Sequence, residues 1–131
     1  MTDLEIAHQQ DIAPWDDRVE EFSDFHVVAF RDRYPVTPGH LLFVPQYNTD
    51  AVIIDCFESA MFHGRRMVEN KECDAFNIGI NMGREAGQTV MYPHVHLIPR
   101  RVGDCTDPIG GVRGVVAGQA NYKTSGYQKP A

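Results

Sequence analysis

Two short apolar runs, residues 26–31 and 40–45, are separated in this chain only by residues 32–39. The separating segment contains two prolines and ends on a glycine, a composition typical of a loop. Parallel strands need a crossover of about a dozen or more residues, usually a helix, and none fits here. The two runs are therefore predicted to pair as antiparallel strands, which limits the fold to classes that contain an antiparallel sheet.

A long amphipathic helix is predicted after the second run. Asp50 is the expected N-cap, and the helix is expected to continue to about Lys71. Apolar residues recur there at steps of three and four and predict one buried stripe, formed by Ile53, Phe57, Ala60, Met61, Gly64 and Val68. A glycine inside a helix costs about 1 kcal/mol relative to alanine. Gly64 is therefore favoured only if the helix packs closely on the sheet.

Two further strands are predicted at residues 76–81 and 90–99, with a turn at residues 82–87 between them. Residues 1–25 are polar and acidic and are expected to form a short helix or a loosely packed arm. Residues 105–131 are expected to form a tail, either ordered over the functional site or frayed. Strands in series with one long helix predict a single α+β domain over residues 1–131.

Charge and cysteine content limit the partners of the chain. The net charge is −6; residues 1–25 hold eight acids and one arginine, net −7, so the remainder sums to +1. This balance argues against a nucleic-acid polymer as partner. The three cysteines, Cys56, Cys73 and Cys105, are odd in number and lack C-x-x-C spacing, which favours a reduced, cytoplasmic setting. No run approaches the roughly 18 apolar residues of a membrane span, so no membrane partner and no signal peptide are expected.

Two histidines stand two residues apart in the last predicted strand. Side chains alternate along a strand, so His94 and His96 are expected on one face, with Val95 and Leu97 on the other. One neutral imidazole can attack a phosphorus atom while the other holds or protonates an oxygen, which predicts nucleotidyl chemistry. Two alternatives stay open: ordinary strand histidines, or a zinc site, for which the sequence lacks cysteine or carboxylate partners. No metal or cofactor is therefore expected.

The residues around this pair resemble the histidine triad family. The segment Tyr92-Pro93-His94-Val95-His96-Leu97-Ile98 is similar to the family motif His-φ-His-φ-His-φ-φ, with tyrosine in place of the first histidine. Residues 29–35 and 38–45 resemble the first half of the family, and residues 81 and 87–90 resemble the approach to its active strand. Residues 110–122 also resemble the diadenosine tetraphosphate hydrolase branch. The resemblance implies an α+β fold with about five antiparallel strands, one long helix, a short N-terminal helix, and a homodimer with a continuous sheet.

Carried over to this chain, the motif makes His94 the nucleophile and His96 the histidine that contacts the phosphate. His40, at the start of the second predicted strand, is expected to be either a structural hydrogen-bonding residue or a partner of the catalytic pair. An imidazole attacks only if its other nitrogen carries the proton. In this family the carbonyl of the first motif residue, here Tyr92, fixes that form.

The resemblance also implies which residues bind the nucleotide. Asp32 matches an acid that hydrogen-bonds the ribose, Thr89 a residue that holds phosphate oxygens, and Gly87 allows close approach of the backbone. The remaining binding candidates are Phe30, Asn81, Gln88, Tyr92 and Arg100. With Phe30, the base site is expected to be walled by the N-terminal arm, Arg31, Arg33 and Tyr34. Four isolated basic side chains are expected either to bind the outer phosphates of a polyphosphate or to be solvated: Arg100, Arg101, Arg113 and Lys123.

Two departures from the family pattern bear on turnover. Tyr92 replaces the first histidine, and Asn48 stands where many relatives have another histidine, so a two-histidine proton relay is missing. General acid and base assistance is worth about 10² to 10⁴ in rate, so slower turnover is expected. The Tyr92 hydroxyl is expected to hydrogen-bond Asn48 or His40. Ordinary polar roles are expected for His8, His26 and His63.

The sequence therefore predicts a nucleotide hydrolase or transferase that acts on dinucleoside polyphosphates through a covalent nucleotidyl-histidine intermediate. Cleavage of nucleoside phosphoramidates, and phosphorolysis with phosphate in place of water, are alternatives within the enzyme class. A nucleotide-binding or signalling protein without turnover is the alternative outside it. A uridylyl or sugar-nucleotide transferase is suggested only by the proline before His94.

Overall fold

The computed structural model describes residues 1–22 and 24–125. The chain divides into two compact units, Met1–Arg101 and a second that begins at Val102. None of the described helices combines the length and the apolarity that crossing a bilayer requires. Cys56, Cys73 and Cys105 carry free thiols; the cytoplasmic setting that they favour stays a prediction.

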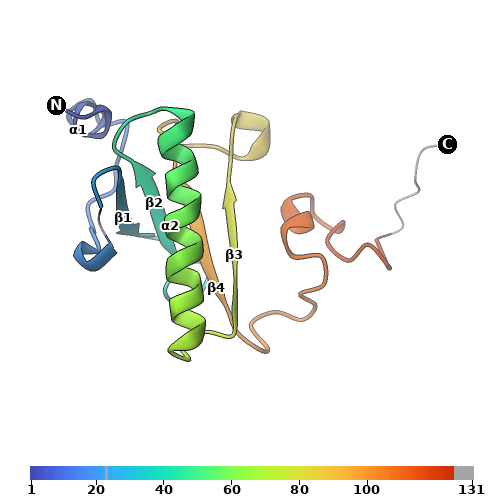
Figure 1. Ribbon diagram of the computed structural model, residues 1–131. Helices are drawn as coiled ribbons and strands as arrows, with labels where there is room; N and C mark the ends of the chain where they lie inside the picture. The colour runs from blue at the N-terminus through green and yellow to red at the C-terminus, as the bar shows by residue number, and fades with distance from the viewer. Residues whose placement is uncertain (23, 126–131) are drawn as a thin grey trace. The chain divides into compact units, whose positions relative to one another are not determined.

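The first unit is built on a four-stranded antiparallel sheet. Its strands follow the order β1 (Val27–Arg31), β2 (Leu41–Pro45), β4 (Val95–Arg100) and β3 (Ala75–Ile80) (Figure 1). The antiparallel pairing of β1 with β2 is confirmed, with Val28 opposite Val44.

A fifth strand is absent from the described residues, so the prediction of about five strands is corrected to four. The N-terminal arm contributes only an isolated bridge between Arg18 and Phe30. The chain then enters a 3₁₀ turn, Glu20–Phe22, which ends the pairing with β1. The predicted short N-terminal helix is present as α1 (Asp3–Gln9), with Thr2 as its N-cap.

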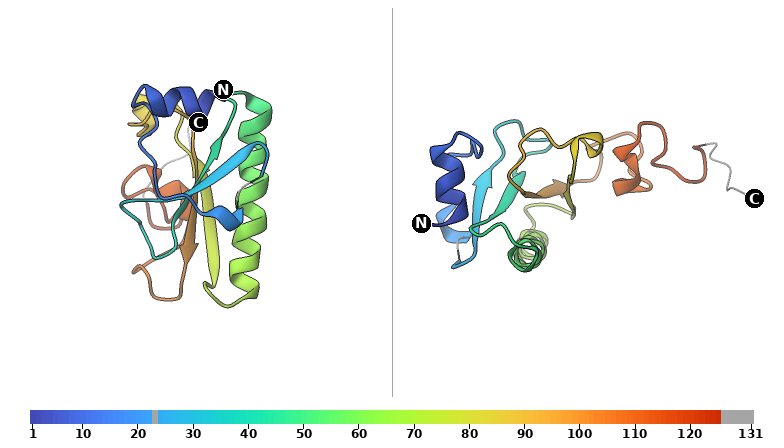
Figure 2. Two further views of the ribbon diagram at one scale, coloured as in Figure 1. Left: turned by 90° about the vertical axis from the view of Figure 1, so that its left-hand side faces the viewer. Right: turned by 90° about the horizontal axis from the view of Figure 1, so that it is seen from above.

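The sheet carries apolar side chains on both faces, because β2 is buried at every position and β1 at every position except Arg31. Helix α2 (Asp50–Glu69) covers one face of the sheet (Figure 2). The core on this face includes Val27, Ala29, Leu41, Phe43, Val95 and Leu97 with Cys56 and Ala60. The arm covers the other face, where the core comprises Val28, Phe30, Leu42, Val44 and Tyr92 with Leu4, Ala7 and Ala13. The functional site lies on this second face.

Helix α2 differs from its predicted bounds at both ends. Thr49, rather than Asp50, is the N-cap, because its hydroxyl accepts a hydrogen bond from the Val52 N–H at 3.3 Å. The helix ends at Glu69, and Lys71 has a φ of 60°, which a helix cannot continue through.

The predicted stripe of α2 is wrong at Met61, which is 38% exposed. The buried face passes instead through Cys56, Ala60 and His63. The close packing expected at Gly64 is confirmed, since a Cβ there would lie 2.8 Å from the ring of Phe76 on β3.

Strand β4 begins at Val95, so the predicted start at residue 90 is wrong. The Gln88 side chain holds the preceding segment in a loop by donating to the carbonyls of Val90 and Met91, both at 3.1 Å. Pro93 has no N–H for a sheet ladder. His94 therefore lies just before the strand and His96 within it.

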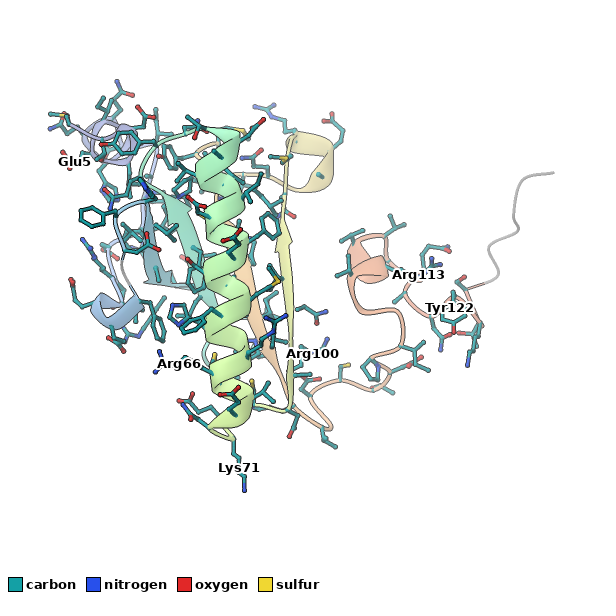
Figure 3. All side chains as sticks on the ribbon, viewed as in Figure 1. Glu5, Arg66, Lys71, Arg100, Arg113 and Tyr122 are labelled. Carbon is teal, nitrogen blue, oxygen red and sulfur yellow. The ribbon has the colours of Figure 1, made fainter. Side chains whose placement is uncertain are left out.

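The second unit contains a 3₁₀ turn, Gly111–Val115, and its own hydrogen bonds. The Asn121 amide donates to Asp107 at 2.9 Å. The Arg113 guanidinium lies 5.9 Å from the centre of the Tyr122 ring, and the two side chains are neighbours in Figure 3. Residues 126–131 of the predicted tail lie outside the described part of the chain.

Candidate active site

A pocket of about 470 Å³ opens on the sheet face that the arm covers. Cross-strand neighbours share a face, and Leu42, His96 and Gly79 are opposite one another in β2, β4 and β3. Six predicted site residues line the pocket together: Asp32, Asn81, Gly87, Thr89, His94 and His96. Arg31, Arg33 and Tyr34, expected at the base site, also line it.

His94 is held in one tautomer by the main chain. Its Nδ1 lies 2.8 Å from the carbonyl oxygen of Tyr92, and because a carbonyl only accepts, Nδ1 must carry the proton. The Nε2 atom therefore keeps its lone pair. Burial lowers the pKa of His94 below the ordinary value, against the opposing effects of the Tyr92 carbonyl and Asp32. The bond that the family resemblance implies is thus present in the structure.

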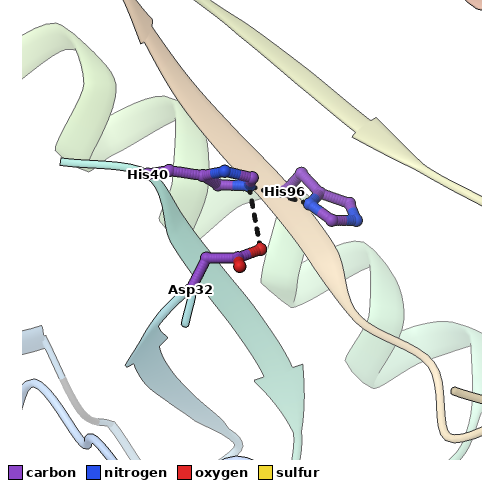
Figure 4. Close-up of side chains that lie close together, drawn as sticks. All are labelled: Asp32, His40 and His96. Carbon is purple, nitrogen blue, oxygen red and sulfur yellow. Dashed lines mark hydrogen bonds and ion pairs between the residues drawn. The ribbon is translucent and has the colours of Figure 1, made fainter. Parts of the chain in front are cut away.

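A chain of donors fixes the tautomers of His40 and His96 as well. The Val36 N–H donates to His40 Nδ1 at 3.1 Å, so a neutral His40 carries its proton on Nε2. That proton faces His96 Nδ1 at 2.9 Å and Asp32 Oδ2 at 3.4 Å (Figure 4). His96 is left with its own proton on Nε2.

Both imidazoles of the pocket are neutral at physiological pH. Burial is the main cause that lowers the pKa of His96 to about 4, with further lowering by His94 and His40. The His94 and His96 rings lie 5.2 Å apart. The pair therefore offers a lone pair on one ring and an N–H donor on the other.

His40 is 3% exposed, and the pocket lining does not include it. Burial lowers its pKa, and Asp32 opposes this effect. His40 is thus a buried hydrogen-bonding partner of His96 and not a residue of the pocket wall.

Asp32, His40 and His96 also form a geometric candidate for a metal site, since one donor atom of each lies within 4.8 Å of the others. A metal ion on His40 Nε2 would move the ring proton to Nδ1, where it would face the Val36 N–H donor. The hydrogen bonds explain this cluster without an ion. The zinc site considered from the sequence would use His94 and His96 together, and so it differs from the cluster of Asp32, His40 and His96.

The loop before β4 places backbone groups beside the histidines. Gly87 has a φ of 93°, which a glycine adopts without strain, and it lines the pocket together with Thr89. Gln88 is not part of the lining. Its side-chain oxygen accepts from the Gly83 N–H at 2.8 Å while its amide binds the other side of the loop, so it fastens the loop.

Three other predicted binding residues also lie outside the pocket lining. Phe30 is 4% exposed and belongs to the core beneath the arm. Tyr92 is 6% exposed. Arg100, labelled in Figure 3, ends β4 and donates to the Asn77 side chain at 2.8 Å.

The predicted hydrogen bond from Tyr92 to Asn48 or His40 is wrong. The Tyr92 hydroxyl donates instead to the carbonyl of Pro45 at 2.6 Å. This carbonyl ends β2, whereas His40 precedes the start of the same strand. Burial raises the pKa of Tyr92, so the hydroxyl keeps its proton.

Trp15 is a pocket residue that the sequence did not single out. Its ring centre lies 4.8 Å from that of His94. The arm was expected to wall the site, but a lone tryptophan in a polar segment carries no signal for this particular contact.

His63 is another departure from expectation. It is 8% exposed, with its ring 3.9 Å from Phe22 and 5.6 Å from Phe43, rather than an ordinary polar residue. Its helical spacing from Cys56 and Ala60 is the signal that could have placed it in the core. His8 and His26 are exposed as expected.

The HIT domain family matches residues 21–103. This chain belongs to the HIT family. The asymmetrical bis(5'-nucleosyl)-tetraphosphatase of Schizosaccharomyces pombe is 36% identical over 86 residues, covering 60% of this chain and 47% of that protein. An adenylylsulfatase of Arabidopsis thaliana is 29% identical over 91 residues, covering 64% and 46% respectively.

A zinc-bound HIT family protein from Mycobacterium smegmatis has a similar solved structure. The TM-score is 0.62 at 30% identity, and the match covers 69% of each chain. This likeness agrees with the α+β fold and its antiparallel sheet. The HIT chain described here spans about half the length of the two curated relatives above.

Proposed function

We propose that this HIT protein hydrolyses the phosphoric anhydride of dinucleoside polyphosphates through a nucleotidyl intermediate on His94. The observation that carries the proposal is the fixed tautomer of His94, whose Nε2 lone pair belongs to a ring that lines the pocket. A lone pair held in this way is the form of imidazole that can attack phosphorus. The S. pombe relative, named as a bis(5'-nucleosyl)-tetraphosphatase, supports the choice of substrate.

In the first step, His94 Nε2 forms a bond to the α-phosphorus while the bond from phosphorus to the bridging oxygen breaks. The electron pair of that bond leaves with the departing nucleotide. In the second step, water attacks the phosphorus, the N–P bond returns its electron pair to Nε2, and a water proton passes to solvent. The products are a nucleoside monophosphate and the remaining nucleotide.

Other residues of the pocket bind and orient the substrate. His96 Nε2–H donates to a non-bridging phosphate oxygen, and Gly87 with Thr89 binds the same phosphate. The Asp32 carboxylate accepts hydrogen bonds from the ribose hydroxyls. Its Oδ1 atom also accepts from the Tyr34 N–H at 2.8 Å, which orients the carboxylate.

The protonation state of His96 favours anhydrides over phosphoramidates. A neutral imidazole is a poor general acid, and the pKa of His96 is lowered to about 4, chiefly by burial. A polyphosphate leaves as a stable anion without a proton, whereas an amine needs one. Anhydride cleavage is therefore the reaction that this pair of rings supports best.

We also propose a homodimer that joins two sheets. β1 and β3 are the edge strands, and β1 already carries the bridge to Arg18, so β3 is the edge offered for pairing. Analytical ultracentrifugation should give a mass twice the 14.8 kDa of the chain. A mass of one chain at micromolar concentration would refute the dimer.

Incubation with diadenosine tetraphosphate tests the hydrolase directly. Chromatography should show release of adenosine monophosphate, abolished by His94→Ala and retained by His26→Ala, a matched change at an exposed histidine. Saturable binding without product would instead favour a nucleotide-binding protein. Release of adenosine diphosphate that depends on added phosphate would indicate phosphorolysis.

A further inference from the structure

The indole of Trp15 packs against the ring of His94 although 78 positions of sequence separate them. The two ring centres are 4.8 Å apart and their planes are inclined at 56°. Trp15 also lies 6.2 Å from Phe30 and 6.4 Å from Tyr92. The indole is therefore wedged between the core of the arm and the imidazole.

The backbone on both sides of Trp15 is fastened. On its C-terminal side, the Arg31 N–H donates to the Asp17 carbonyl and the Val19 N–H to the Ala29 carbonyl, both at 2.8 Å. On its N-terminal side, the Ala13 N–H donates to the Ala7 carbonyl at 3.3 Å. The Trp15 carbonyl itself accepts from His8 Nε2–H at 3.1 Å. These bonds fix the backbone that carries the indole.

Two ion pairs between the arm and residues 31–33 add to these hydrogen bonds. Asp17 meets Arg31 at 3.0 Å and Asp16 meets Arg33 at 3.1 Å. All four side chains are largely exposed, so each pair contributes at most about 1 kcal/mol to stability. The backbone bonds and the indole itself carry most of the constraint.

The hydrogen bond at Nδ1 does not by itself fix the His94 ring. A side-chain partner, His40, anchors His96 at Nδ1. The hydrogen bond described for His94 is the one from Nδ1 to the Tyr92 carbonyl. A single bond permits the ring to swing, and a ring flip would exchange the positions of nitrogen and carbon.

We propose that Trp15 is a positioning residue for His94: its indole blocks the swing of the imidazole and keeps the Nδ1–H on the Tyr92 carbonyl. The consequence for rate rests on the proposed function, whereas the ring orientation does not. Burial, to which the indole contributes, also keeps the charged form of His94 unfavourable and so lowers its pKa.

The first test reads the tautomer of His94 by long-range ¹H–¹⁵N NMR at neutral pH. The wild type should show the Nδ1–H form at His94 and the Nε2–H form at His96. Trp15→Leu keeps an apolar contact with Phe30 but removes the ring, and it should give a mixture of tautomers at His94. His96 is the internal control and should not change, because His40 fixes it.

Trp15→Phe retains an aromatic ring and should keep the Nδ1–H form. Trp15→Met serves as a second ring-free variant if the leucine variant does not fold. An unchanged His94 tautomer in a folded variant without the ring would overturn the proposal.

The second test measures turnover of diadenosine tetraphosphate. Misplacing the nucleophile should lower kcat about 10- to 100-fold in Trp15→Leu, with a smaller change in KM, and Trp15→Phe should restore most of it. An unchanged kcat in Trp15→Leu would contradict the positioning role. An inactive wild type would refute the proposed function, while the NMR result would still decide the role of Trp15.

Discussion

At the level of single residues, backbone groups decide the chemistry of the pocket. The Tyr92 carbonyl sets the proton of His94, and the Val36 N–H sets those of His40 and, through it, His96. The first contact was predictable because both groups lie on the same short segment. The contacts of Val36 and Trp15 were not, since they depend on a loop and an arm whose path the sequence pattern does not define.

Replacement of Tyr92 by phenylalanine separates structure from catalysis. Tyr92→Phe removes the donor to the buried Pro45 carbonyl and should lower the free energy of unfolding by about 1–3 kcal/mol. Tyr92 does not line the pocket, so kcat should stay close to that of the wild type. Chemical denaturation and steady-state kinetics give both values. A much larger loss of kcat would show that the hydroxyl takes part in turnover.

The lowered pKa values of the pocket histidines predict the pH dependence of activity. His94 must be neutral to attack, and its pKa lies below the ordinary value because of burial. The acid limb of kcat/KM should therefore lie below about pH 6.5, the usual histidine pKa. A limb at or above that pH would contradict the neutral, buried nucleophile.

The same shifts predict how stability depends on pH. As pH falls below about 6.5, histidines of the unfolded chain become protonated, whereas the buried histidines of the folded pocket stay neutral. His96 in the folded protein becomes protonated only near its lowered pKa of about 4. The free energy of unfolding should therefore decrease through this window. Replacing His96 with glutamine should weaken the decrease measured by urea titration at several pH values; an unchanged slope would contradict the burial of its neutral form.

At the level of elements, the short connection between two apolar runs predicted the antiparallel strand pair, and the three- and four-residue periodicity predicted the long helix. The strands β1 and β2 are buried nearly throughout, and α2 keeps its three- and four-residue stripe apart from Met61. The start of β4 was missed because side-chain hydrogen bonds of Gln88 override the apolar character of the segment before it. The count of strands was missed because the arm turns away after one bridge.

Helix α2 packs closely against β3 at Gly64, which faces the ring of Phe76. Alanine there would normally stabilise a helix by about 1 kcal/mol. Because its Cβ would fall 2.8 Å from the Phe76 ring, Gly64→Ala should instead destabilise the protein by about 1–3 kcal/mol. Glu58→Ala, at an exposed position of α2, is the control and should change stability by about 0.5 kcal/mol or less. A more stable Gly64→Ala variant would show that the ring has room to move.

At the level of the molecule, the site belongs wholly to the unit Met1–Arg101. α2 covers one face of the sheet, and the arm leaves a pocket on the other, beside the end of β4 that carries the histidines. The family and its α+β fold were predictable because the motif combines several segments of sequence. The shape of the pocket was not, because it depends on how the arm packs.

The central claim is that His94 becomes covalently bound to a nucleotide during turnover. It is tested most directly by mixing the protein with diadenosine tetraphosphate, stopping the reaction within milliseconds in alkali, and mapping modified peptides by mass spectrometry. The account predicts an adenylyl group on His94, absent from His94→Ala and from protein incubated with adenosine monophosphate. Product release without any adduct on His94, or an adduct on another residue, would contradict it.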